Sequence, residues 1–246
     1  MGIGGLDKEF ADIFMNVLAT HVLPLEIIEQ MGLKHVKGLL LYGPPGCGKS
    51  LMATEIGKML NAKKLTIVNS YKILSNHKQT TAQIHKMFSS AKEEYRRMGA
   101  NSGLHVIILD KIDGFNRQSS KNALCQLLSK MDEVDQLNNI LVIGLTTWPG
   151  LIDDALVRPG RLEVQVEIGL PDEEGREQIL LIETATMRNL NRLASDVNFQ
   201  ELARETEGYS GMDLNNMVSD ALDNAICRHI QTNSTEELQV MLEDFL

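Results

Sequence analysis

Short apolar runs that alternate with helix-like segments constrain the fold of this chain more than any other feature. The segments between the runs have helical periodicity, as in SLMATEIGKML (50–60) and QTTAQIHKMFSSAKEEYRRM (79–98). Strands that alternate with helices form a parallel sheet covered on both faces, with the active chemistry at the carboxyl ends of the strands. The pattern therefore predicts an α/β domain with a parallel sheet. Its expected strands occupy residues 38–43, 64–69, 104–110, 140–146 and 163–168.

The strand signal fades after the fifth run, and the rest of the sequence has the periodicity of helices. Pro171 and Asp172 precede one helical pattern and predict its start, and Ser210 is expected to cap another. We expect residues 1–170 to form the α/β domain and residues 171–246 to form a small helical domain with a C-terminal tail. The last stretch, QTNSTEELQVMLEDFL, predicts a polar turn and a short acidic amphipathic helix. That helix either packs on a partner or is a surface helix or a frayed terminus.

The composition limits the partners and the compartment of the chain. Its 246 residues include 24 Lys and Arg against 33 Asp and Glu, and the net charge of -9 argues against a surface built to hold nucleic acid. The three cysteines, Cys47, Cys125 and Cys227, form neither a closely spaced pair nor a metal motif, so we expect a reducing compartment. The sequence has no secretory signal and no stretch of about 18 apolar residues. We therefore expect a cytoplasmic protein without membrane insertion.

A glycine-rich motif follows the first expected strand. The stretch GPPGCGKS has the G-x-x-x-x-G-K-[ST] spacing of a phosphate-binding loop, between an apolar strand and a helical pattern. Its glycines let backbone N–H groups point into one concavity, and Lys49 bridges the terminal phosphates. Ser50 offers a hydroxyl to magnesium. The alternative is a glycine turn without a ligand. The expected nucleotide-binding residues are Gly43, Pro44, Pro45, Gly46, Cys47, Gly48, Lys49, Ser50 and Leu51.

Asp110 ends the third expected strand, LHVIILD. Its carboxylate can therefore reach the metal shell beside the phosphate-binding loop. An aspartate at the end of a strand is common, so a purely structural role is the alternative. Together with the loop upstream, however, the pattern predicts that Asp110 and Ser50 share a magnesium ion.

Longer blocks of sequence surround these motifs. Among them are GIGGLDKEFADIF, LIDDALVRPGRLEVQVEIGLPDEEGREQIL and GYSGMDLNNMV. In these blocks and in the phosphate-binding loop, nearly the whole chain resembles the AAA+ ATPases, in particular the first ATPase domain of the vesicle-fusing type. The resemblance implies a hexameric ring of identical or different subunits, with ATP and magnesium at the subunit boundaries. It also implies the unwinding of SNARE complexes, reached through adaptors that other subunits hold.

The resemblance implies roles for residues outside the phosphate-binding loop. Arg158 and Arg161, in RPGRLE, are implied to reach the γ-phosphate of a neighbouring subunit, where a cation offsets the charge of the transferred group. A salt bridge within the chain is the alternative for this pair. The residues implied to approach the adenine are Ile3, Gly4, Gly211 and Met212.

Cys47 lies inside the phosphate-binding loop. Its position beside a helix amino terminus and near Lys49 favours the thiolate. The resemblance implies an alkylation-sensitive thiol whose modification prevents nucleotide binding. The alternative is an inert small residue.

Lys111 stands where the family has a glutamate that accepts a hydrogen bond from the attacking water. An ammonium group has three donors and no acceptor, so it cannot orient a water in this way or take its proton. We therefore expect hydrolysis to be weak or absent. Lys111 either contacts the γ-phosphate or turns to solvent, and the sequence does not choose between them. Asp113 lies two residues further on and is expected to point elsewhere.

Further departures from the family concern γ-phosphate sensing, the lid and the substrate grip. Thr147 replaces the usual asparagine sensor. Trp148 replaces an arginine, and we expect it to pack locally, with a binding role as the alternative. Glu183 replaces a histidine that touches the nucleotide. No aromatic residue occupies the segment that grips substrate in the family; His77 or Lys78 contacts a polypeptide there, or the loop is simply solvated.

These features favour an ATP-binding AAA+ module with impaired hydrolysis and a regulatory or structural role. An active ATPase that remodels SNARE complexes is the alternative, and a degraded copy that binds no nucleotide is a third possibility. A protein made of this chain alone would lack the family's adaptor-binding domain and second ATPase ring, so we would not expect it to act as the full disassembly machine.

Overall fold

The computed structural model describes residues 2–22, 27, 30, 31, 35–75, 79–117, 120–134, 137–231 and 237–245. By their contacts the residues form two compact units. The sheet unit contains Lys8–Gly43 and Lys49–Ile168. The lid unit contains Met1–Asp7, Pro44–Gly48 and Gly169–Leu246. The start of the chain and most of the phosphate-binding loop therefore group with the C-terminal helices.

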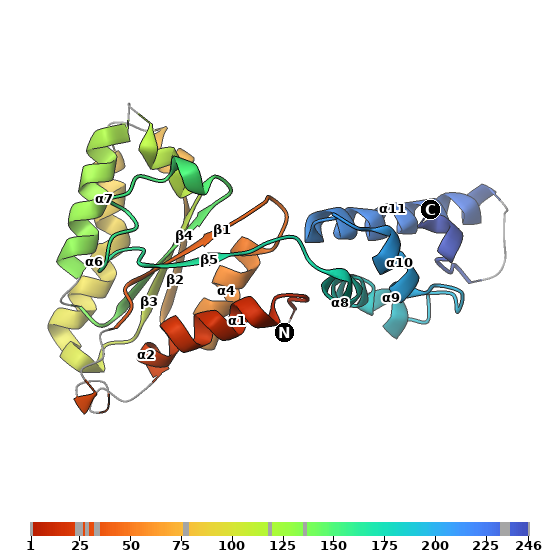
Figure 1. Cartoon of the computed structure of the whole chain (residues 1–246), viewed down its shortest axis with the longest axis horizontal. Helices are drawn as coiled ribbons and strands as arrows, with labels where there is room; N and C mark the ends of the chain where they lie inside the picture. Colours follow the sequence, from red (N-terminus) through yellow and green to blue (C-terminus); the bar gives the residue numbers. More distant parts are fainter. Residues whose placement is uncertain are drawn as a thin grey trace. The chain divides into compact units, whose positions relative to one another are not determined.

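The sheet unit is built on a parallel sheet (Figure 1). In the described residues its strands are β1 (Gly38–Tyr42), β2 (Lys64–Asn69), β3 (His105–Asp110), β4 (Ile140–Thr146) and β5 (Val164–Glu167). Each lies within an apolar run of the sequence, so the predicted parallel α/β sheet is confirmed. The order across the sheet is β2-β3-β4-β1-β5, and every neighbouring pair is parallel.

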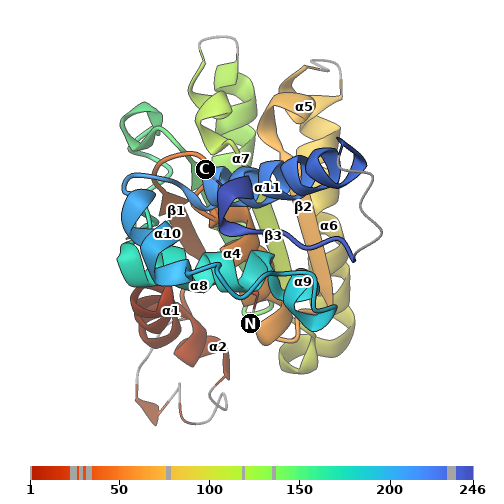
Figure 2. The same ribbon diagram turned by 90° about the vertical axis from the view of Figure 1, so that its right-hand side faces the viewer.

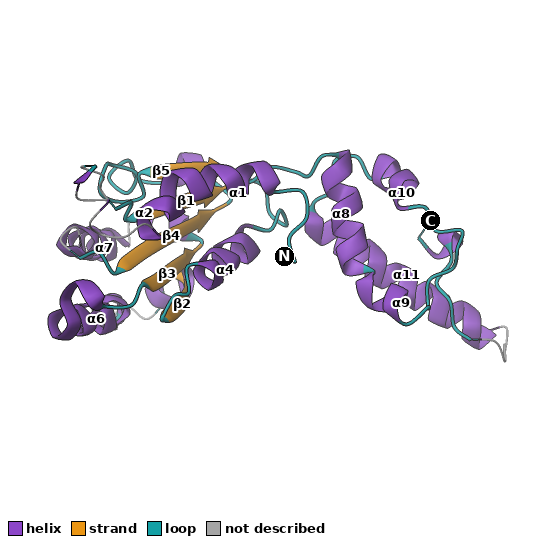
Figure 3. Cartoon of the chain, turned by 90° about the horizontal axis from the view of Figure 1, so that it is seen from below, coloured by secondary structure: helices purple, strands orange, loops and turns teal. Residues whose placement is uncertain are grey.

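Helices cover both faces of this sheet (Figure 3). One face carries α6 (Thr80–Met98) and α7 (Lys121–Val134), and the other carries α1 (Asp7–Ile13) and α4 (Lys49–Met59). Successive side chains of a strand point to opposite faces, so a strand covered on both sides needs apolar residues throughout. This explains why β3 and β4 read as continuous apolar runs, whereas the edge strands β2 and β5 are partly exposed.

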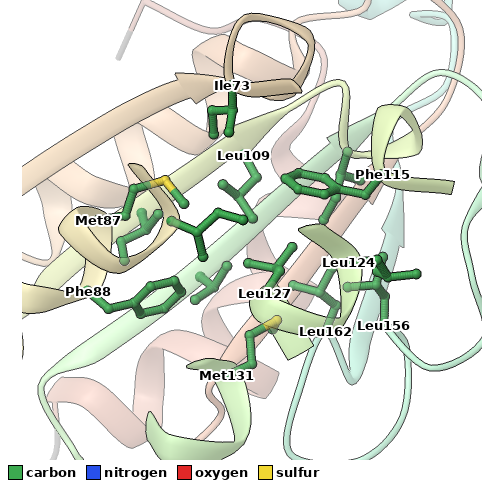
Figure 4. Packing of buried hydrophobic residues seen from close by; sticks show 14 of the residues in the cluster. Ile73, Met87, Phe88, Leu109, Phe115, Leu124, Leu127, Met131, Leu156 and Leu162 are labelled. Carbon is green, nitrogen blue, oxygen red and sulfur yellow. The ribbon is translucent and has the colours of Figure 1, made fainter. Parts of the chain in front are cut away.

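The core beneath α6 and α7 joins these helices to the sheet (Figure 4). Phe88 of α6, Leu127 of α7 and Leu109 of β3 are fully buried in it. Phe115, from the short helix η3 (Ile112–Asn116) that follows β3, is also buried there. Burial of one such side chain stabilises a fold by about 1.5–3 kcal/mol. This packing fixes the segment that follows Asp110.

Shorter elements complete the described part of the sheet unit. They are η1 (Phe14–Leu18), α2 (Ala19–Val22), α5 (Ser70–Leu74), η2 (Gly99–Asn101) and η5 (Pro149–Leu151). The segment with His77 and Lys78, considered above for substrate contact, lies outside the described residues. Among the helices that are described, none combines the length and apolar character needed to cross a membrane.

The lid unit contains the helices α8 (Glu173–Glu183), α9 (Ala185–Asn189), α10 (Phe199–Glu205) and α11 (Gly211–Gln231) (Figure 2). Both predicted helix starts are confirmed. Asp172 accepts a hydrogen bond from the backbone N–H of Gly175 at 2.8 Å and caps α8. Ser210 precedes α11, and its hydroxyl accepts from the N–H of Asp213 at 3.3 Å, while the Asp213 carboxylate accepts from the Ser210 N–H at 2.9 Å. This reciprocal pairing satisfies donors at the start of α11.

The predicted acidic amphipathic helix at the C-terminus is wrong for the described residues. Residues 237–245 form an isolated parallel bridge, between Val240 and Leu193, and one short turn, η6 (Leu242–Asp244). Val240 and Phe245 are buried in the core of the lid unit, and the Arg228 guanidinium of α11 donates to the Asp244 carboxylate at 2.6 Å. The apolar side chains of this segment thus pack on the chain's own helices.

Candidate functional site

The carboxyl edge of the sheet gathers several of the predicted site residues. All strands are parallel, so all of them end at the same edge. In the pairing register Asp110 lies beside Leu145, and Tyr42 lies beside Thr146. The residues that follow β1 and β4, and the last residue of β3, are therefore near neighbours along this edge.

The glycines of the phosphate-binding loop have backbone conformations that other residues rarely adopt. The φ angles are 139° at Gly43, 79° at Gly46 and 87° at Gly48. A Cβ atom at Gly43 would lie 2.1 Å from the carbonyl oxygen of Ile168, so no larger residue fits there. At Gly48 a Cβ atom would meet only a methyl of Leu6, at 3.7 Å. Such a loop ahead of a helix amino terminus fits a phosphate group.

Lys49 and Ser50 begin α4 directly after these glycines. Lys49 is buried, and its ammonium donates to the carbonyl oxygen of Gly43 at 2.7 Å. Ser50 is exposed, and Leu51 is 46 % exposed. The lysine is thus folded along the loop, with its charge beside the place where phosphates would bind. Hydroxyl and carboxylate oxygens, as on Ser50 and Asp110, are the ligands that magnesium prefers.

The middle of the phosphate-binding loop contacts the lid unit. The backbone N–H of Met212 donates to the carbonyl oxygen of Gly46 at 3.1 Å, which gives the start of α11 a partner for one of its unpaired donors. A Cβ atom at Gly46 would lie 2.5 Å from the Ser210 hydroxyl. The residues predicted to approach the adenine all belong to this unit, together with Pro44 and Pro45; they are Ile3, Gly4, Gly211 and Met212.

Cys47 is buried in this loop, with only 6 % of its surface exposed. Its thiol donates to the carbonyl oxygen of Pro45 at 3.6 Å. The alkylation sensitivity implied by the family resemblance remains a prediction, and the burial means that a reagent must open the loop to reach the sulfur.

Asp110 is partly buried at the end of β3, and its carboxylate accepts a long hydrogen bond from the Asn69 amide at 3.4 Å. It also lines an open hollow of about 460 Å³ at the end of β2. Solvent and small ligands can therefore reach it.

Lys111 adopts the left-handed conformation, with φ 56° and ψ 52°. A residue with a side chain pays about 1–2 kcal/mol for this conformation, so the turn after Asp110 is a strained one. The side chain is exposed, and within the described parts of the chain its ammonium has no hydrogen bond or ion pair. Whether this exposed side chain contacts a γ-phosphate stays a prediction.

Asp113 is held by two hydroxyl groups. The Tyr71 hydroxyl donates to one carboxylate oxygen at 2.9 Å, and the Thr146 hydroxyl donates to the other at 2.8 Å. The bond to Asp113 raises the pKa of Tyr71 above its usual value. The Thr146 hydroxyl in turn accepts from the Trp148 N–H at 3.0 Å. Sequence reasoning missed Tyr71 and Thr146, because no motif links residues so far apart along the chain.

Thr147 and Trp148 follow β4, where the family resemblance implies the γ-phosphate sensor. Thr147 is partly buried, and its side chain has no hydrogen bond within the described residues. Trp148 is 64 % exposed, so the expected local packing of its indole ring is wrong. Its backbone is held by Thr146, as described above, while the ring projects from the surface.

Arg158 and Arg161 differ in their surroundings. The Arg161 guanidinium binds both carboxylate oxygens of Asp132 on α7, at 2.8 and 2.9 Å, and also donates to the Ala155 carbonyl. The pairing lowers the pKa of Asp132. Arg158 is exposed and has no ion pair among the described residues. The salt bridge within the chain, left open by the sequence, is therefore present at Arg161.

Glu183 ends α8 and accepts a hydrogen bond from the Asn215 amide of α11 at 2.6 Å. Asn215 lies one turn beyond Gly211, which contacts the phosphate-binding loop. This bond fixes the direction of the Glu183 carboxylate.

The described residues contain no cluster of three or more His, Cys, Asp or Glu side chains able to hold a metal ion.

A family model for the ATPase family associated with various cellular activities (AAA) matches residues 39–170, and one for the AAA+ lid domain matches residues 196–240. The chain belongs to the AAA ATPase family. The predicted resemblance is thereby confirmed.

Several similar proteins are related to vesicle fusion by name. The chain is 51 % identical to the Vesicle-fusing ATPase of Caenorhabditis elegans over 94 % of its own length and 29 % of that protein. It is 48 % identical to the Vesicular-fusion protein SEC18 of Saccharomyces cerevisiae, over 100 % of the chain and 35 % of that protein. A more distant AAA relative, the Proteasome-activating nucleotidase of Methanocaldococcus jannaschii, is 33 % identical over 99 % of the chain. The chain thus spans about a third of the length of the two vesicle-fusion proteins.

Proposed function

We propose that this AAA ATPase chain is an ATP-binding module of the vesicle-fusing type, that its hydrolysis is weak or absent, and that it acts as a regulatory or structural subunit. Nucleotide binding is supported by the three loop glycines with positive φ angles, by the buried Lys49 and by the family to which the chain belongs. The vesicle-fusing type is supported by the identity to the proteins named above.

The nucleotide would be held from both of its ends. Backbone N–H groups of Gly43–Ser50 and the ammonium of Lys49 would bind the phosphates, with the adenine near Ile3, Gly4, Gly211 and Met212. Magnesium, when bound by Ser50 and Asp110, would neutralise phosphate charge. Nucleotide binding therefore does not depend on the positions at which this chain departs from the family, with the exception of the position of Glu183.

Lys111 is the observation that carries the proposed loss of hydrolysis. The residue after Asp110 offers only donors, and the next carboxylate, Asp113, already accepts from two hydroxyls. We therefore propose that neither group accepts a proton from an attacking water. A positioned general base contributes about 100- to 10,000-fold to a rate, so its loss would leave very slow turnover.

As a subunit the chain would still serve its neighbours. We propose a ring, hexameric as in the family, of copies of this chain or of this chain with an intact relative. Arg158 and Arg161 would face the nucleotide of the adjoining subunit, and SNARE proteins would be reached through adaptors held by other subunits in the cytoplasm. Such a subunit would bind ATP and offer its arginine side chains to a neighbour without hydrolysing its own ATP.

The second candidate is an active ATPase that remodels SNARE complexes. The retained phosphate-binding loop, Asp110 and both arginines favour it, as does the high identity to proteins named as vesicle-fusing ATPases. In that case another group must position the attacking water in place of Lys111.

ATP binding and hydrolysis on one preparation test these proposals. At a concentration 100-fold above its dissociation constant, ATP should stabilise the folded chain by about 2.7 kcal/mol, measured by thermal unfolding. Lys49→Ala should remove most of this stabilisation, because it deletes the cation of the phosphate-binding loop. Stabilisation by ATP with negligible phosphate release supports the ATP-binding subunit with impaired hydrolysis. Rapid phosphate release supports the active ATPase. The absence of stabilisation by ATP overturns both proposals.

A further inference from the structure

The start of the chain is docked on α8 by close backbone contact. A Cβ atom at Gly5, where φ is 72°, would lie 2.6 Å from the Cα atom of Gly175. A Cβ atom at Gly4 would lie 2.9 Å from Cβ of Gln178 and 3.0 Å from the backbone nitrogen of Ile179. Distances this short mean that only glycine permits the observed approach. Residues 2–6, here called the strap, therefore lie directly on the helix.

A single side chain completes the docking. The carboxamide oxygen of Gln178 accepts a hydrogen bond from the backbone N–H of Gly5 at 2.8 Å. The contact is partly buried, so water replaces the lost acceptor poorly when the glutamine is removed. The strap also approaches the phosphate-binding loop, because the Leu6 Cδ1 atom lies 3.7 Å from the place that a Cβ atom of Gly48 would take. Gln178 thus fixes a segment that runs between α8 and the loop.

From this geometry we infer that Gln178 is a positioning residue for the base of the bound nucleotide. It acts through Gly5 and sets the place of Ile3 and Gly4, while the phosphates bind elsewhere, on the loop. The inference rests on the proposed nucleotide binding. It predicts that loss of the Gln178 acceptor weakens ligands that carry a base and spares a phosphate chain that has none.

The test compares ATP with inorganic tripolyphosphate, each with magnesium, by calorimetric titration of the full chain. Gln178→Leu removes the acceptor at similar size and should weaken ATP binding about 3- to 10-fold, the equivalent of one ordinary hydrogen bond. Its affinity for tripolyphosphate should stay within about twofold. Gln178→Glu keeps an acceptor oxygen and should recover most of the ATP affinity.

A pair of glycine variants gives an independent measurement. Gly4→Ala should weaken ATP selectively because its Cβ atom meets α8, whereas Gly2→Ala is the matched control, since no atom lies within 4 Å of its Cβ position. Hydrogen exchange reports the docking itself. The Gly5 amide should exchange faster in Gln178→Leu than in the unaltered chain or in Gly2→Ala.

Three results would overturn the inference. The first is unchanged ATP affinity in Gln178→Leu although the Gly5 amide exchanges faster. The second is an equal loss of ATP and tripolyphosphate affinity, which would point to general damage of the lid unit. The third is failure of the unaltered chain to bind ATP, which also overturns the proposed function and is thereby told apart from the other two.

Discussion

At the scale of single residues, the segment after β3 combines two unusual features. Lys111 has a left-handed backbone and carries a cation at the position where the family resemblance implies a glutamate. The next acidic side chain, Asp113, holds together the segments that follow β2 and end β4, through Tyr71 and Thr146. We propose that the first residue affects water activation, whereas the second joins two segments at the carboxyl edge of the sheet.

Asp113→Ala should destabilise the chain by about 1–3 kcal/mol. Thr146 is 1 % exposed, so its hydroxyl would lose its acceptor in a place where water hardly enters. Urea unfolding followed by circular dichroism measures the change. Asp154→Ala, at an exposed carboxylate in the same unit, is the control and should shift stability by no more than about 0.5 kcal/mol. Equal unfolding midpoints for the two variants would contradict the structural role of Asp113.

Glu94 should make stability depend on acid pH. The Gly103 N–H, Lys63 and His105 all bind its carboxylate and lower its pKa from 4.5 to about 2. Because the folded pKa lies below the unfolded one, this stabilisation is complete above about pH 4.5 and is lost as the pH falls toward 2.

Glu94→Gln should therefore be less stable at neutral pH and flatter in stability between pH 5 and pH 2. Unfolding midpoints in urea across this range measure the slope. Glu93→Gln, at the exposed neighbouring position, should keep the slope of the unaltered chain. If stability falls with pH as steeply in Glu94→Gln as in Glu93→Gln, Glu94 is not the source of the pH dependence.

At the scale of elements, the sequence predicted those strands, helix starts and turns that depend on neighbouring residues alone. Continuous apolar runs identified β1 and β3, and the caps at Asp172 and Ser210 identified the starts of α8 and α11. The phosphate-binding loop was predictable because its glycine spacing reflects backbone angles that only glycine adopts easily.

Contacts between distant segments were not predictable in this way. The pairing of Arg161 with Asp132 and the bonds of Asp113 join elements through the tertiary fold, and composition does not reveal such partners. The C-terminal segment shows the same limit. Its acidic periodicity suggested a helix, but the bridge from Val240 to Leu193 and the burial of Phe245 draw the backbone into an extended path.

Phe245→Ala should destabilise the lid unit by about 3 kcal/mol, because it leaves a cavity in the core that holds the C-terminal segment. Hydrogen exchange of α11 and thermal unfolding measure the effect. Leu190→Ala removes a side chain that is 64 % exposed in the same unit and should change little. If the two variants unfold alike, the C-terminal segment does not stabilise the lid unit.

At the scale of the whole molecule, Arg158 and Arg161 differ in their contacts within the chain. Arg161 is bound to α7 through Asp132, whereas Arg158 is exposed and unpaired within the described residues. A surface ion pair contributes about 0–1 kcal/mol to the stability of a fold. Breaking the ion pair between Arg161 and Asp132 would therefore cost little. In the proposed ring we therefore expect Arg158, rather than Arg161, to contact the nucleotide of a neighbouring subunit.

Arg158→Ala, made in a Lys111→Glu background, should leave stability within about 0.5 kcal/mol of its parent but lower ring-dependent hydrolysis by about 1,000-fold. Arg161→Ala should lose up to about 1 kcal/mol of stability as well as activity. Steady-state hydrolysis and thermal unfolding of assembled samples separate the two effects. Hydrolysis as fast in Arg158→Ala as in its parent would mean that Arg158 does not act across a subunit boundary.

We propose that the ammonium group after Asp110 leaves ATP bound but unreacted, and single-turnover hydrolysis tests this most directly. ATP binding is measured on the same preparation of the unaltered chain. We predict saturable binding with negligible phosphate release, release at least about 100-fold faster in Lys111→Glu, and continued slow release in Lys111→Ala, which removes the cation without supplying a carboxylate. Phosphate release by the unaltered chain as fast as by Lys111→Glu would contradict the claim.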